Sequence, residues 1–487
     1  MSVTYCLHRL PVGGGRRIIG MAGWMVAAML WAVASQAQST AVLDDDQHLD
    51  ADPAEDITFA STTGTVSRSG DGSAGDPWIY DFSALALGSG GTVDLYDYKL
   101  YHEGRSDETD QRNIILDLAD YHLAGSGPLA IRTYQGVTQR PSDNLVVTNA
   151  ATIAMGGIDG RVRQTSGGNT THAQIGDVTI LSDGDIRLDY IWAYGDKTSG
   201  YIASYGGDVS IRGGGDVKIA DSSDVAGDIL TYVPTSDERG GDVTVAHAGD
   251  FLVGNINTKN FSGSGGGANP GWRPGNVFLD GGDSSGDAMV KGYLQFHEGA
   301  ERYRAGQATL EIKNYNNVTI EDDIVAKPKD INTDYDHLKS LEVFIKDGIA
   351  GDIALLGQID LEDTGRGSHG TLDLVADGTV TLAAIDLDKV GYAYLSSGTD
   401  SSLITGAVSN FDTNSPSGGG TPANPYVTDE TRLRAPAGES IYYTYEDGGL
   451  NDELGGYAWQ LKDLDGTTDG GLLMTEPVFT GSVIIMR

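Results

Sequence analysis

The stretch between Gly176 and Asp250 decides the fold of this chain. It holds three pairs of short strand-like segments, each opened by Gly-Asp: Gly176-Asp-Val-Thr-Ile with Gly184-Asp-Ile-Arg-Leu, Gly207-Asp-Val-Ser-Ile with Gly215-Asp-Val-Lys-Ile, and Gly241-Asp-Val-Thr-Val with Gly249-Asp-Phe-Leu-Val. The two openings of a pair lie eight residues apart, and the pair recurs after 31 and again after 34 residues. A fixed period of this size is typical of a stacked repeat architecture.

Apolar and polar residues alternate within these segments, as in Val178 and Ile180 or Ile186 and Leu188. One face of each strand is therefore expected to point inward and the other toward water. Weaker copies of the unit extend the pattern in both directions, over residues 112–410, at steps of 31–34 residues. The sequence predicts an all-β protein with a parallel β-helix, or β-solenoid, closed by N- and C-terminal caps.

Short strands at this spacing are also compatible with a sandwich or an antiparallel barrel. The segments between the strands lack hairpin signals such as Asn-Gly, and the similarity joins units that lie one full period apart. Both observations favour parallel stacking of equivalent strands.

Composition divides the rest of the chain into segments around this repeat. The expected segments are a signal peptide (1–37), an acidic lead-in (38–56), an N-terminal cap (57–111), the β-helix (112–410), a linker rich in Gly, Ser and Pro (411–430) and an aromatic C-terminal cap (431–487).

The N-terminus has the pattern of an export signal. Arg9, Arg16 and Arg17 precede an apolar run over residues 18–34, and Ser35-Gln36-Ala37 offers small residues at a cleavage site. An uncleaved membrane anchor is the alternative, since the run is about long enough to span a bilayer. No later run is long enough to cross a membrane as a helix, so the mature chain is expected to have no membrane span. The predicted location is extracellular or on the outer cell surface, with the periplasm as an alternative.

The formal net charge of −37 limits the possible partners. Nucleic acid is excluded as a partner because phosphate binding requires basic patches. The single cysteine, Cys6, lies in the predicted signal peptide, so the mature chain has no disulfide. A long solenoid does not need one, since each coil buries its neighbour.

The repeated Gly-Gly-Asp-Val-x-Ile followed by Gly-Asp-Ile-x-Leu resembles the right-handed parallel β-helix of exported Gram-negative bacterial proteins of the filamentous-haemagglutinin and autotransporter-passenger type. The resemblance covers about 290 residues. It implies a surface-exposed or secreted, non-catalytic structural protein with an adhesin-like role. A glycan or a neighbouring cell-surface protein is the partner that this resemblance suggests.

The Gly-Asp openings suggest a candidate calcium site. Stacking of the coils would align Asp177, Asp208 and Asp242 in one column and Asp185, Asp216 and Asp250 in a second. Carboxylates about 4.8 Å apart repel one another by roughly 1 kcal/mol even in water, and calcium, which takes oxygen ligands, would relieve that repulsion. The alternative is that Asp merely favours the turn after Gly and stays solvated. Calcium therefore remains a candidate cofactor, and no other is expected.

Aromatic side chains supply the candidate ligand contacts. They are Tyr190, Trp192, Tyr194 and Trp272. The alternative role for each is to fill the space beside a strand.

A polysaccharide-degrading lyase or glycoside hydrolase is the alternative function, because such enzymes also use β-helix scaffolds. They require paired carboxylates, or calcium with a basic residue. Asn332-Thr-Asp334 and Ser368-His369-Gly370 faintly resemble a polygalacturonase set, but tripeptides of this kind are expected by chance in so Asp-rich a chain.

Overall fold

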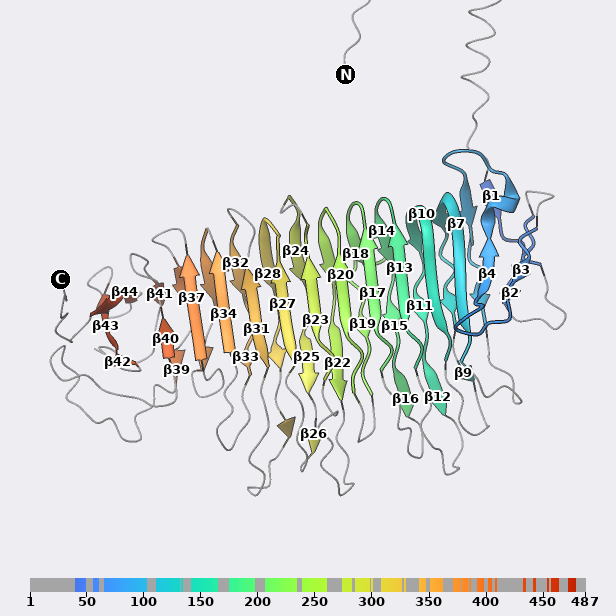
Figure 1. Cartoon of the computed structure of the whole chain (residues 1–487). Helices are drawn as coiled ribbons and strands as arrows, with labels where there is room; N and C mark the ends of the chain where they lie inside the picture. Colours follow the sequence, from blue (N-terminus) through green and yellow to red (C-terminus); the bar gives the residue numbers. More distant parts are fainter. Residues whose placement is uncertain are drawn as a thin grey trace, which may run out of the picture.

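A computed structural model shows a parallel β-solenoid whose coils lie side by side along one axis (Figure 1). It describes residues 40–49, 56–60, 65–102, 111–131, 133–134, 142–164, 175–197, 206–233, 239–260, 274–282, 285–297, 299–300, 308–325, 328–329, 341–346, 351–361, 371–376 and 378–383, and beyond them only the strands between 385 and 478. Within these residues the one helical segment is the 3-10 turn η1 (Phe82–Leu85).

The first ladder is formed by the opening strand of each coil, paired in parallel with its equivalents. Its strands are β4 (Trp78–Asp81), β7 (Asn113–Ala124), β10 (Asn144–Met155), β13 (Val178–Ser182), β17 (Val209–Gly213), β20 (Val243–Ala246), β23 (Val277–Asp280), β27 (Thr309–Lys313), β31 (Glu342–Lys346), β34 (Thr371–Ala376), β37 (Tyr392–Ser397) and β40 (Arg432–Arg434).

The second ladder follows after a short corner and continues the same sheet. It contains β1 (Thr40–Val42), β5 (Thr92–Asp94), the second halves of β7 and β10, β14 (Ile186–Leu188), β18 (Val217–Ile219), β21 (Phe251–Val253), β24 (Asp287–Val290), β28 (Asn317–Ile320), β32 (Ile353–Leu355), β35 (Val380–Leu382), β38 (Ser402–Ile404) and β41 (Ile441–Tyr443).

The third ladder is a separate parallel sheet. It contains β2 (Gln47–His48), β6 (Leu100–Tyr101), β8 (Leu129–Ala130), β11 (Ile158–Asp159), β15 (Ile191–Trp192), β19 (Ile229–Leu230), β22 (Ile256–Asn260), β25 (Leu294–His297), β29 (Ile324–Val325) and β33 (Ile359–Asp360). Small parallel sheets join β9 (Thr133–Tyr134), β12 (Val162–Gln164) and β16 (Gly195–Lys197), then β26 (Gly299–Ala300) and β30 (Pro328–Lys329), then β36 (Ile385–Asp386) and β39 (Val408–Ser409).

The register confirms the repeat that the sequence predicted. Val178 pairs with Val209, Val209 with Val243 and Val243 with Val277, so equivalent residues stack from coil to coil. The inward positions are buried and form one continuous apolar core. This core accounts for the alternation of apolar and polar residues in the strands. Every second side chain points inward, where it packs against the equivalent apolar side chains of the neighbouring coils.

Both ends of the described ladders contain antiparallel strands. At the N-terminal end β3 (Arg68–Ser69) pairs antiparallel with β4, while β4, β5 and β6 already pair in parallel with the following coil, so the ladders begin before residue 112. At the other end β44 (Leu472–Val478) pairs antiparallel with β41 and with β43 (Tyr457–Asp463), and β42 (Glu453–Leu454) pairs antiparallel with β43. The assignment of caps to these segments stays a prediction.

We expect Phe251→Ala to lower the free energy of unfolding by about 3–5 kcal/mol, the usual cost of a large-to-small change in a core. Phe251 is 1% exposed and lies in an inward column between Val217 and Ala288. Urea unfolding followed by circular dichroism measures the change. The matched control is Leu252→Ala on the outward face of the same strand, and an equal loss for both variants would contradict the assigned inward and outward faces.

Candidate functional site

The first predicted aspartate column is a chain of hydrogen bonds between coils. The backbone N–H of Asp208 donates to Asp177 Oδ1 at 2.9 Å, and the N–H of Asp242 donates to Asp208 Oδ1 at 2.8 Å. The chain continues in both directions through asparagines: Asp177 N–H donates to Asn144 Oδ1 and Asn276 N–H to Asp242 Oδ1. Each side chain thus holds the residue at the same corner of the next coil.

The second column has the same geometry. The N–H of Asp216 donates to Asp185 Oδ1 at 2.9 Å, the N–H of Asp250 donates to Asp216 Oδ1 at 3.0 Å, and the N–H of Asp287 donates to Asp250 Oδ1 at 3.0 Å. The structure therefore brings together both sets of three aspartates that the sequence singled out.

A third column of this type lies at the corner before the third ladder, and the sequence analysis missed it. Asn255 N–H donates to Asp228 Oδ1 at 2.9 Å, and Tyr293 N–H donates to Asn255 Oδ1 at 2.9 Å. Asp228 follows Gly227 as the Gly-Asp pattern requires, but Asn255 follows Gly254 and Tyr293 follows Gly292, so the Asp is not repeated in the next two coils. The signal that could have found them is an Asp or Asn directly before the first buried residue of a strand, as Asp228 precedes Ile229.

Cations lie beside both predicted aspartate columns. Arg239 Nη2 contacts Asp242 Oδ2 and lies 3.7 Å from Asp208 Oδ1, and Lys218 Nζ lies 3.3 Å from Asp216 Oδ2. Burial, together with the charge of Asp208, still raises the pKa of Asp177, although the hydrogen bond from the Asp208 backbone works in the opposite direction.

These contacts supply the carboxylates with partners from the protein itself. Among the described residues no group of three or more His, Cys, Asp or Glu side chains is arranged to hold a metal ion. The calcium hypothesis stays a prediction.

We expect Asp216→Asn to fold with nearly unchanged stability, because its amide oxygen can accept the same bond from Asp250. Asp216→Ala is expected to lose about 1 kcal/mol of unfolding free energy, the usual net value of one hydrogen bond. Thermal and urea unfolding of the two variants check this. Equal destabilisation of both would assign the effect to lost charge instead of the lost acceptor.

Three of the predicted aromatic contacts, with Tyr232, form an aromatic column beside β15 and β19, which we define as Tyr190, Trp192, Tyr194 and Tyr232. The rings of Tyr190 and Trp192 stack with centroids 3.9 Å apart at 23°, and those of Tyr194 and Tyr232 stack at 4.4 Å and 21°. Trp192 and Tyr194 meet edge to face at 6.4 Å. All four side chains are half-buried.

Cations flank the aromatic column. The Arg161 guanidinium lies 4.4 Å from the Trp192 ring centroid and donates to both carboxylate oxygens of Asp159, at 2.7 and 2.8 Å. The hydrogen bond to Asp159 raises the pKa of Arg161 further above its ordinary value. Lys259 Nζ lies 5.3 Å from the Tyr232 ring centroid.

Much of the ring surface in this column is therefore covered by neighbouring rings and by Arg161, as expected for side chains that pack beside strands. A ligand-contact role for Tyr190, Trp192 and Tyr194 stays a prediction, and Trp272 lies outside the described residues. Tyr232, Arg161 and Lys259 were missed by the sequence analysis because they enter the column only through the pairing of coils.

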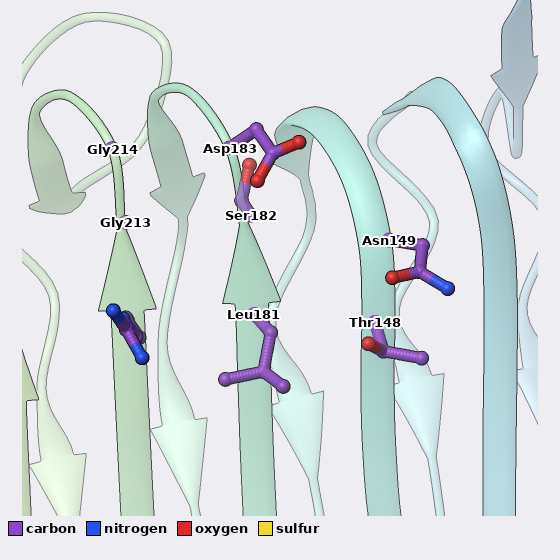
Figure 2. A pocket seen from close by; sticks show the side chains of 8 residues that line it. Thr148, Asn149, Leu181, Ser182, Asp183, Gly213 and Gly214 are labelled. Atoms are coloured by element: carbon purple, nitrogen blue, oxygen red, sulfur yellow. The ribbon is translucent and has the colours of Figure 1, made fainter.

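A depression of about 420 Å³ lies at the corner between the first two ladders (Figure 2). Its lining comes from three consecutive coils: Thr148 and Asn149 of β10, Leu181 and Ser182 of β13 with Asp183 after it, and Arg212, Gly213 and Gly214 of β17 and its turn. We call this the corner depression. None of these residues was predicted from the sequence to belong to a site.

The corner depression exists because the chain turns tightly there. The pairing of β10 with β13 shifts register between Val147 and Ala150, and Asn149 has a φ of 51°. A Cβ on Gly214 would lie 1.9 Å from the carbonyl oxygen of Asp183, so only glycine fits and no side chain fills that side.

The corner depression provides one carboxylate and one guanidinium among its lining residues. It does not supply the several carboxylates that the enzyme alternative requires. Asn332, Asp334 and His369, the weak enzyme-like set in the sequence, lie outside the described residues.

A buried histidine lies at the same kind of corner in the next coil, directly after β20. His247 is 4% exposed, its Nε2 lies 2.9 Å from the hydroxyl of the fully buried Tyr315, and Gly249 N–H donates to its Nδ1 at 3.3 Å. Burial lowers the pKa of His247 and outweighs the nearby charges of Asp216, Asp250 and Asp280, which raise it.

This lowered pKa predicts a loss of stability in acid. The unfolded chain binds the His247 proton below pH 6.5, the ordinary pKa, while the folded chain resists it. The contribution of neutral His247 to the free energy of unfolding is therefore fully present above pH 6.5. It decreases as the pH falls from 6.5 toward the lowered pKa of His247 in the folded chain. Unfolding free energy measured at pH 7.5 and pH 5.5 is expected to decrease less in His247→Gln than in the wild type, and equal decreases would contradict the account.

Comparison with protein-family models, with characterised proteins and with solved structures gives no match to this chain. Among the described residues no helix is long and apolar enough to cross a membrane. The resemblance to haemagglutinin-type passengers is thus supported as far as the parallel β-solenoid.

Proposed function

We propose that this chain is an exported, non-catalytic β-solenoid that attaches to a glycan through its outward faces. The corner depression is the observation that carries the proposal. It places an exposed carboxylate, Asp183, an exposed amide, Asn149, and an exposed guanidinium, Arg212, around the half-buried Leu181. A sugar presents hydroxyl groups that donate and accept hydrogen bonds beside apolar C–H surface, so this mixture suits it.

The repeat favours attachment by many weak contacts. Equivalent positions recur at each coil, about 4.8 Å apart along the ladders, and a long polymer can therefore touch several coils at once. Linked weak contacts of this kind raise the overall strength of binding without requiring one deep pocket. Such a scaffold suits an adhesin-like or structural role, and the net charge of −37 would keep it soluble outside the cell.

Binding to insoluble polysaccharides tests this function. The mature chain, residues 38–487, is expected to be retained on at least one member of a panel of plant, algal and microbial polysaccharides. Asp183→Ala is expected to weaken retention several-fold, while Asp322→Ala, which removes an exposed carboxylate far along the solenoid, leaves retention unchanged. No retention on any glycan would overturn the proposal.

The same incubations separate attachment from catalysis. New reducing ends or unsaturated uronate absorbance, with or without calcium, would establish the polysaccharide-degrading alternative. The proposal expects neither product.

Export has its own test. When the full chain is expressed in a Gram-negative host, N-terminal sequencing of the protein outside the cytoplasm is expected to begin at Gln38, after Ala37. A chain that keeps Met1 and stays in the cytoplasm would contradict export.

A further inference from the structure

Where the structure describes them, nearly all lysine and arginine side chains have a partner. On the described residues, lysine and arginine side chains form ion pairs with carboxylates or lie over aromatic rings, as Arg187 does with Asp224, Lys313 with Glu311 and Arg68 with Trp78. A chain with a net charge of −37 has carboxylates in excess. A cation without a partner is therefore unexpected.

Arg212 is that exception. Among the cationic side chains that the structure describes, it is the one with neither an ion pair nor an aromatic ring, and it is exposed. Asp183 lines the same depression, yet no ion pair joins the two side chains. Along the first ladder, the position of Arg212 is taken by Ala246 in the next coil, then by Asp280 and then by Lys313. The charged groups of Asp280 and Lys313 lie 4.0 Å apart.

The geometry points to a binding site for an acidic sugar residue, a uronate, in the corner depression. This inference rests on the proposed attachment to a glycan and names the class of sugar. The Arg212 guanidinium binds the sugar carboxylate, since its planar donors match the two oxygens of a carboxylate. The Asn149 Nδ2 already donates to Asp117 Oδ1 at 2.9 Å. Asp183 and the amide oxygen of Asn149 accept hydrogen bonds from the sugar hydroxyls, and Leu181 packs against the C–H face.

The two charges of the site act on different parts of such a ligand. Asp183 repels a carboxylate and accepts hydrogen bonds from hydroxyl groups, while Arg212 attracts the carboxylate. A uronate carries both kinds of group, so one orientation satisfies the site. A simple inorganic anion meets Arg212 but leaves Asp183 without a favourable contact.

Isothermal titration of the mature chain with matched oligosaccharides tests the inference. The probes are oligogalacturonate, oligomannuronate and oligoglucuronate, each beside its carboxyl-reduced neutral form. The wild type is expected to bind at least one acidic form about tenfold tighter than its neutral form, which corresponds to about 1.4 kcal/mol.

Four variants assign the preference to this site. Arg212→Gln is expected to abolish the preference for the acidic form, and Arg212→Lys to keep part of it. Asp183→Asn is expected to weaken the neutral form more than the acidic form, because it weakens the acceptor for sugar hydroxyls but also removes a charge that repels the sugar carboxylate. Arg187→Gln, which changes an arginine paired with Asp224 outside the depression, is the control and is expected to bind as the wild type does.

The outcomes separate this inference from the proposed function. Binding of neutral and acidic forms with equal affinity, or a preference that survives Arg212→Gln, overturns the uronate site and leaves glycan attachment standing. Binding of no glycan overturns both. Displacement of the acidic oligosaccharide by sodium sulfate as effectively as by free uronate shows a site for any anion and overturns sugar recognition.

Discussion

The hydrogen bond from a backbone N–H to the Asp or Asn oxygen of the preceding coil is the contact on which the solenoid corners depend. Strands end at the corners, so the strand ladders leave backbone donors there that need other partners. Asp177, Asp208 and Asp242 provide these partners at one corner, and Asp185, Asp216 and Asp250 at the next. The bond also fixes the register of neighbouring coils, because each acceptor reaches only the equivalent residue above it.

This requirement explains why so acidic a chain can stack its carboxylates. Each carboxylate accepts a hydrogen bond that favours the charged form, and Lys218 and Arg239 lie beside the two columns. Asn144 and Asn276 extend the first column without a charge. We infer that these contacts offset part of the repulsion between neighbouring carboxylates.

The strands and the two aspartate columns could be predicted from the sequence because one local rule, Gly-Asp followed by alternating apolar residues, repeats at a nearly fixed period. The column through Asp228 and Asn255 could not, because its coils are separated by loops of different length. The corner depression was also out of reach. It depends on a register shift in β10, on Asn149 and on the missing side chains of Gly213 and Gly214, and its lining residues come from three different coils. That Arg212 has neither an ion pair nor an aromatic partner among the described residues follows only from the positions of the neighbouring charged groups.

The melting temperature of residues 38–487, measured in a chelator and again in millimolar calcium chloride, tests the central claim most directly. If backbone donors and nearby cations balance the aspartate columns, the two melting temperatures agree. A clear rise in melting temperature with calcium that is lost in Asp216→Asn would show that a bound cation joins the columns and would contradict this account.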